Sequence, residues 1–134
     1  MSSIFSTFST FSITKNGKAL DTALYTWDEE SKTLATTETG LVLDFSRYHN
    51  CTFNTGYNCT FKTGMNCTFD TGSNCTFDTS YGCTFDTGQN SVVIRRDIFQ
   101  VITLTEDSNL IRTKASTEAG YYTADEVVLQ ELIK

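Results

Sequence analysis

Apolar and polar positions between Asn50 and Asn90 recur with a period of eight residues. Five consecutive octads follow the pattern Asn-Cys-Thr-Phe-x-Thr-Gly-x, with Gly82 replacing Asn in the fifth and Ser80 replacing Gly in the fourth. Cys, Phe and the second Thr are two residues apart, so they share one face of an extended strand. The first Thr and the variable polar residue point the other way. Each octad therefore predicts about five residues of strand and a three-residue corner.

The Cys and Phe positions do not vary across the five octads, which predicts the interior of an all-β parallel solenoid. Successive coils would stack about 4.8 Å apart, with Cys on Cys and Phe on Phe. Cys would act as a small apolar filler, and the inward Thr hydroxyls would need partners in the corner backbone or in each other. The predicted core is Cys51, Phe53, Cys59, Phe61, Cys67, Phe69, Cys75, Phe77, Cys83 and Phe85.

Asn and Gly occupy the corner positions, and they are the residues that best tolerate a positive φ. The exchange of Asn for Gly in the fifth octad predicts a left-handed backbone position at each corner. The predicted corner residues are Asn50, Gly56, Asn58, Gly64, Asn66, Gly72, Asn74, Gly82 and Gly88.

The octad leaves open how many copies close one coil. Two copies give a flat, two-sheet roll of about three turns, and three copies give a triangular prism. A single chain would complete barely two turns of a prism, fewer than the roughly three repeats that stacking needs for stability. Three chains that each contribute one octad per layer remove this difficulty. We therefore favour an intertwined trimeric β-helix and keep the two-sheet roll as the alternative.

The flanking sequences predict caps, which divides the chain into 1–42, 43–96 and 97–134. The middle segment includes two imperfect copies, one with Leu43 and Phe45 in the Cys and Phe positions and one over 91–95. The first segment predicts an arm with Phe5, Phe8 and Phe11, a hairpin at 15–18, and strands at 20–27, 32–36 and 41–45. The last predicts strands at 98–104 and 110–114 and a short helix from Thr123, whose Thr-Ala-Asp-Glu start is a capping-box signature.

Composition narrows the function classes. The 134 residues carry a formal net charge of −6, which disfavours a nucleic-acid surface. No apolar run is long enough to span a membrane, and the start of the chain lacks the pattern of a signal peptide. We expect a protein that stays in the cytoplasm of the producing cell or is assembled there into something larger.

Candidate chemistry is sparse. Cys residues eight apart do not match zinc-ligand spacing, and an odd number in the cytosol predicts free thiols. His49 is the only histidine, so a catalytic triad is not expected. Asn-Cys-Thr sequons tile the corners and are read as structural. Asp70, Asp78 and Asp86 predict an outward acidic ladder, the five first-position Thr residues a hydroxyl ladder, and Arg95-Arg96-Asp97 an ion-paired cap. We predict no enzymatic activity, no cofactor and no metal site.

Two resemblances bear on function. The eight-residue period with Gly resembles, over residues 43–96, the octapeptide triple-stranded β-helix of phage cell-puncturing needles, although that family uses Val and Gly where this chain has Cys and Phe. The tandem Cys-Thr-Phe-x-Thr-Gly octads are similar to those of uncharacterised phage-type proteins, which imply no activity. These resemblances imply a homotrimeric stalk or virion appendage. The alternative is an intracellular phage-encoded inhibitor that presents an acidic face to a host enzyme.

Overall fold

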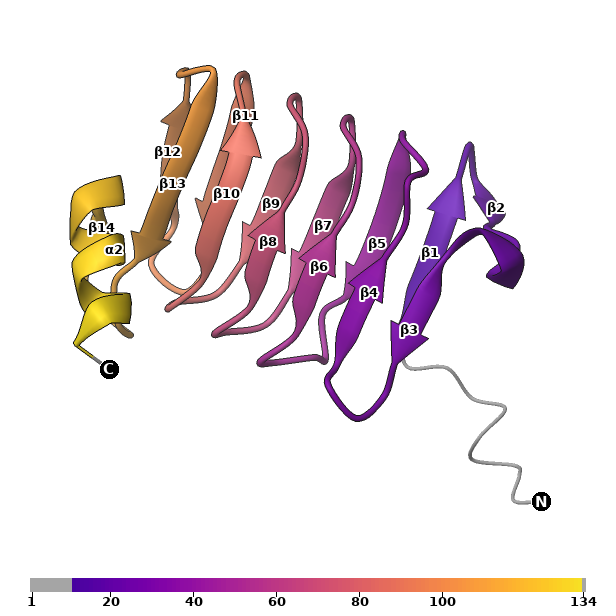
Figure 1. Ribbon diagram of the computed structural model, residues 1–134, viewed down its shortest axis with the longest axis horizontal. Coiled ribbons are helices and arrows are strands. Elements are labelled where there is room, and N and C mark those ends of the chain that lie inside the picture. The colour runs from indigo at the N-terminus through magenta and orange to yellow at the C-terminus, as the bar shows by residue number, and fades with distance from the viewer. Residues whose placement is uncertain (1–10, 134) are drawn as a thin grey trace.

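The computed structural model describes residues 11–133, which form two seven-stranded sheets and one short α-helix (Figure 1). From edge to edge, sheet A contains β12 (Gln100–Leu104), β11 (Ser91–Arg95), β9 (Thr76–Thr79), β7 (Thr60–Thr63), β5 (Leu41–Phe45), β1 (Ser12–Lys15) and β2 (Lys18–Ala19). Sheet B contains β14 (Tyr121–Tyr122), β13 (Ser108–Thr113), β10 (Thr84–Gly88), β8 (Thr68–Asp70), β6 (Thr52–Asn54), β4 (Thr33–Ala35) and β3 (Thr26–Asp28). The all-β parallel solenoid predicted from the octads is confirmed.

The coils close differently from those of the favoured trimer, in which each of three chains would contribute one octad per layer. Thr52 pairs in parallel with Thr68, and Thr60 pairs with Thr76, so each coil of the octad region contains sixteen residues, or two octads. Alternate octads enter opposite sheets, and one chain closes every coil. The two-sheet roll is therefore the architecture, and the intertwined prism is wrong. With two octads per coil, the octads and the imperfect flanking strands together form about four turns, so one chain has enough repeats to stack.

Parallel pairing begins at β4, within the segment that was predicted as an N-terminal cap. There Leu34 lies beside Phe53, in the position of an octad Phe. In β5, Leu43 lies beside Phe61 and Phe45 beside Thr63. Leu43 thus occupies the Phe position rather than the predicted Cys position. The segment between β5 and β6 is two residues longer than the octad spacing allows, and this shifts the register.

Phenylalanine rings fill the space between the sheets. Phe69 stacks on Phe53 and Phe85, with ring centroids 5.1 and 4.9 Å apart, and Phe61 stacks on Phe77 at 5.1 Å. Rings of the two sheets meet edge to face, as do Phe69 and Phe77 at 4.9 Å. Both geometries are favourable for aromatic pairs. All ten predicted core side chains are at most 1% exposed.

Two different requirements shape the corners. Asn50, Asn58, Asn66, Asn74 and Gly82 have φ between 56° and 70°, which is the left-handed region. The glycines at 56, 64, 72 and 88 do not have positive φ, so the left-handed prediction is wrong for them. They are needed because coils approach closely: a Cβ on Gly72 would lie 2.9 Å from Cβ of Tyr57.

Inward threonine hydroxyls find partners in both predicted ways. The Thr63 hydroxyl lies 3.3 Å from the Gly64 carbonyl oxygen, to which it donates. The Thr71 hydroxyl donates to Thr87 at 2.8 Å, and Thr87 in turn bonds the Gly72 carbonyl at 2.8 Å. These bonds tie the interior hydroxyls to the corner backbone. A buried hydroxyl or carbonyl group without a partner would lower the stability of the fold.

Antiparallel strands cap both ends. At one end β1 pairs with β5 and with β2 through the predicted hairpin, where Asn16 and Gly17 both have positive φ. Phe11 stacks on Phe45 at 4.4 Å, while Phe5 and Phe8 of the predicted arm lie outside the described residues. A 3-10 turn, η1 (Thr22–Leu24), replaces the start of the strand predicted at 20–27.

The opposite end carries β12, β13, β14 and the helix α2 (Ala124–Leu132), which lies against β13 and β14 (Figure 1). The Thr123 backbone N–H donates to Glu126 at 2.9 Å, as the capping-box signature predicts. Arg95 is fully buried and joins this cap to the last coil. Its guanidinium binds both carboxylate oxygens of Asp97, at 3.1 and 2.6 Å, and donates to the Glu118 carbonyl at 2.6 Å.

Candidate interaction surfaces

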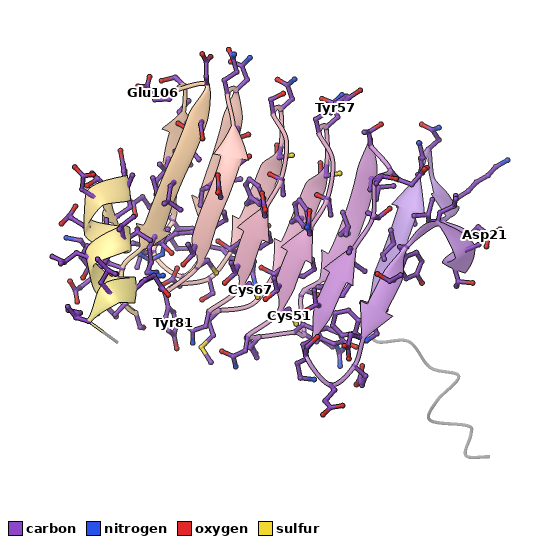
Figure 2. The ribbon with its side chains drawn as sticks, viewed as in Figure 1. Asp21, Cys51, Tyr57, Cys67, Tyr81 and Glu106 are labelled. Atoms are coloured by element: carbon purple, nitrogen blue, oxygen red, sulfur yellow. The ribbon has the colours of Figure 1, made fainter. Side chains whose placement is uncertain are left out.

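The cysteine side chains form two internal columns. Because the coils repeat every sixteen residues, Cys51, Cys67 and Cys83 follow one another along sheet B, and Cys59 and Cys75 along sheet A. Cys51 and Cys67 lie at equivalent corners of successive coils (Figure 2). All five are free thiols and buried.

The columns are hydrogen-bonded as well as packed. Each thiol donates to the carbonyl two residues earlier, as Cys51 does to His49 at 3.5 Å. The Cys67 N–H donates to the Cys83 sulfur at 3.4 Å. At the end of each column an oxygen replaces sulfur as the acceptor: the Cys75 N–H donates to Ser91 of β11, and the Cys83 N–H donates to Thr113 of β13. The position therefore selects a small side chain with a heteroatom, which the interpretation of Cys as apolar filler missed.

Burial should make all five thiols unreactive, because each cysteine is at most 1% exposed and a reagent cannot reach the sulfur. Loss of water raises the pKa of the Cys59 thiol above its ordinary value of 9.0, and the thiolate is the reactive form. We expect no labelling by iodoacetamide at pH 8 in the folded chain and five labels in urea at the same pH, counted by intact-mass spectrometry. Fast labelling of any thiol in the folded chain would contradict this. Because the folded pKa is raised, the contribution of Cys59 to stability is complete below pH 9.0 and is lost as the pH rises further.

The predicted three-residue acidic ladder is wrong. Asp70 and Asp86 are neighbours on sheet B, but Asp78 lies on sheet A beside Lys62 and is ion-paired with Arg96 at 3.0 Å. Desolvation, followed by the charge of Asp70, raises the pKa of Asp86. The first-position threonines divide in the same way: Thr52, Thr68 and Thr84 lie on sheet B, and Thr60 and Thr76 on sheet A. Because successive octads alternate between the two sheets, residues that form one series in the sequence are divided between two opposite faces of the solenoid.

The single histidine has a structural role. His49 lies in the corner between β5 and β6, and its Nδ1 accepts a hydrogen bond from the Met65 N–H at 3.0 Å. It ties one coil to the next. Among residues 11–133 no group of three or more His, Cys, Asp or Glu side chains is arranged to hold a metal ion.

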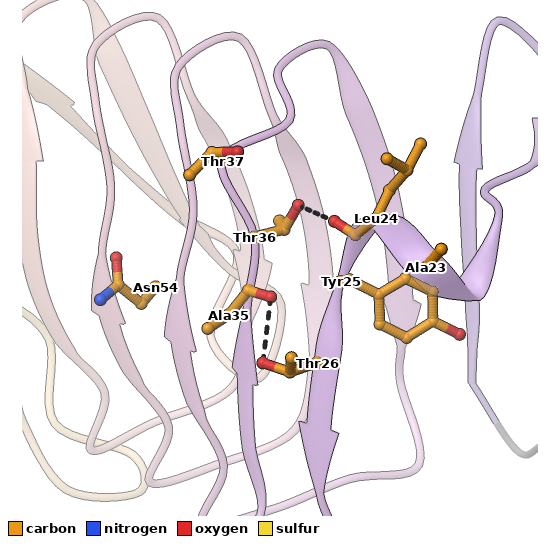
Figure 3. Close-up of a pocket in the computed structure, with 8 residues that line it drawn as sticks. All are labelled: Ala23, Leu24, Tyr25, Thr26, Ala35, Thr36, Thr37 and Asn54. Atoms are coloured by element: carbon orange, nitrogen blue, oxygen red, sulfur yellow. Dashed lines mark hydrogen bonds between the residues drawn. The ribbon is translucent and has the colours of Figure 1, made fainter.

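A shallow depression of about 360 Å³ lies where η1 meets the outer face of sheet B (Figure 3). Uncharged residues line it, and two of its hydroxyls are already bonded to backbone: Thr36 to the Leu24 carbonyl at 2.7 Å and Thr26 to the Ala35 carbonyl at 3.4 Å. It offers no charged group to orient a ligand.

Two further cavities lie at the C-terminal end. One of about 470 Å³ separates α2 from sheet B, and Arg112 crosses it to bond Thr84 at 2.8 Å and Glu131 at 2.6 Å. The other, of about 370 Å³, lies between the end of β12, β13 and Tyr121. The first is bounded by the octad residues Thr68 and Thr84 as well as by the cap, and the second by cap elements alone.

Exposed apolar side chains gather at the same end. Ten large apolar residues between positions 11 and 133 are strongly exposed, and seven of them belong to the C-terminal cap: Phe99, Val101, Tyr121, Val128, Leu129, Leu132 and Ile133. Of the helix residues predicted to share one apolar face, only Val127 is buried. The remaining face of α2 is open to solvent, as Figure 1 places the helix at the tip of the solenoid.

In comparisons with protein families, curated proteins and solved structures, nothing matches this chain. No helix in the described part of the chain is both long and apolar enough to cross a membrane.

Proposed function

We propose that the chain is a non-enzymatic structural protein, a rigid β-solenoid rod that joins a larger assembly by its C-terminal end. The observation that carries this proposal is the gathering of seven exposed large apolar side chains on the C-terminal cap. Apolar surface of this kind marks protein interaction sites. The rod itself, with a ring-packed core and hydrogen-bonded corners, provides a stiff spacer behind that surface.

The resemblance of the octads to those of phage-type proteins supports assignment of the assembly to a virion. A homo-oligomer remains part of the proposal, but it would form between complete solenoids, because each chain closes its own coils. A trimer built from shared coils is no longer proposed, because no coil needs a second chain to close it. The alternative, an acidic inhibitor of a host enzyme, is weakened because Asp78 lies on the face opposite Asp70 and Asp86.

Fractionation of a lysate from the producing cells tests the proposal. We expect the chain to sediment with assembled particles, and the Leu129→Lys/Leu132→Lys variant to remain in the supernatant. Leu24→Lys, which changes an exposed leucine at the other end of the rod, is the matched control and should still sediment. Recovery of the wild-type chain only in the supernatant, bound to a host enzyme, would favour the inhibitor.

A further inference from the structure

The edge of sheet A at β12 is open. β12 pairs with β11 on one side and is the outermost strand of its sheet. It is five residues long and uncharged, whereas the other edge strands, β2, β3 and β14, have only two or three residues. Natural sheets usually protect their edges with short strands, charges or proline. β12 has none of these, so another strand could pair with it.

Phe99, which immediately precedes β12, is 90% exposed and has φ of 57°. A left-handed conformation costs a side chain with a Cβ roughly 1–2 kcal/mol, and the octad corners meet the same need with Asn or Gly. A bulky aromatic residue at this position does not stabilise the isolated chain. It is suited to contact with a partner, because aromatic side chains anchor interfaces.

The cavity of about 370 Å³ lies at the other end of the same strand. Thr103, Leu104 and Thr105 form part of its wall, together with β13 and Tyr121. The exposed ring of Phe99 therefore lies at the start of β12, and the cavity lies at its end.

We infer that two copies of this chain pair through β12, antiparallel about a twofold axis, with Phe99 of each copy in the other's cavity. If the axis passes through Ile102, Val101 lies opposite the partner's Thr103 and Phe99 lies opposite the partner's Thr105. A twofold axis places the start of β12 beside the end of the partner's β12. Each Phe99 ring therefore faces the cavity of the other copy, and the contact forms twice. No charged residue lies within either strand, so the paired strands themselves bring no like charges opposite each other. The pairing rests on the proposed structural role and identifies one contact of the C-terminal end.

Light scattering during size-exclusion chromatography of the full chain tests the pairing. We expect a mass near 30 kDa, twice the 15.0 kDa of one chain, at tens of micromolar. Phe99→Asn should weaken association on the order of 30-fold, as the loss of an interface anchor does. It should also raise the melting temperature of the monomer, because Asn accepts a positive φ.

Val101→Lys should weaken association about tenfold or more, since a lysine on an edge strand opposes pairing. Val42→Lys changes a similarly exposed valine in the middle of sheet A and should leave the dimer intact. A wild-type monomer, a trimer, or a dimer unaffected by both β12 changes would overturn the inference. The mass in solution is measured without the particles, so failure of the β12 pairing can be distinguished from failure of the proposed structural role.

Discussion

Replacing Asp97 by alanine is expected to lower the free energy of unfolding by about 3–5 kcal/mol. Arg95 has no exposed side-chain surface, and Asp97 binds it through two hydrogen bonds. Without the carboxylate, the guanidinium would remain buried with only backbone carbonyls as acceptors. Removing one member of a buried pair leaves an uncompensated charge, which is the costly case. Urea unfolding followed by circular dichroism measures the loss.

Asp78→Ala is the matched control. Asp78 pairs with Arg96 at 3.0 Å, but both side chains are about one-third exposed, so the change should cost only about 0–1 kcal/mol. The double variant Arg95→Met/Asp97→Ala should recover much of the loss, because it removes the charge as well as its partner. Equal effects of Asp97→Ala and Asp78→Ala would show that burial of Arg95 does not govern stability.

Phe69→Ala is expected to destabilise the chain by about 3–5 kcal/mol. Phe69 occupies the centre of the ring ladder, stacked on Phe53 and Phe85 and edge to face with Phe61 and Phe77. The neighbouring coils are held at a fixed spacing by backbone hydrogen bonds, so they cannot close around the missing ring. Urea unfolding of the variant measures the loss of free energy.

Phe99→Ala removes the same chemical group from a site that is 90% exposed. Measured at submicromolar concentration, it should change stability by no more than about 0.5 kcal/mol. A loss for Phe69→Ala below about 1 kcal/mol would mean that the coils collapse into the cavity and that the ladder is not rigid.

The period-eight pattern was sufficient to predict the strands, their inward and outward faces and the left-handed Asn corners, because each follows from spacing within one octad. The number of octads per coil could not be predicted. Every octad has the same inner face, so the pattern fits two or three walls equally well. Closure depends on the flanking strands, and Leu34 of β4 contributes to the first coil although its sequence has little octad character.

The candidate surface was harder to predict. The period-eight series in Asp70, Asp78 and Asp86 is misleading, because alternate octads face opposite directions. The open edge at β12 depends on the long-range order of strands, in which β13 returns to sheet B and leaves β12 outermost. The signal available in the sequence was Phe99 itself, an aromatic residue between predicted strands, but its positive φ cannot be read from residue types.

Sixteen residues advance the solenoid by one strand spacing, about 4.8 Å. The rod can therefore be lengthened or shortened only in steps of two octads if both caps are to keep their places. An odd number of added octads would deliver β11 to sheet B and β10 to sheet A, so that Arg95 and the open edge would emerge on the wrong face. Duplication or deletion of octads is therefore expected to keep both caps in place only when the number of octads changes by an even number. With even changes, the length of the rod can vary while both caps keep the same orientation relative to each other.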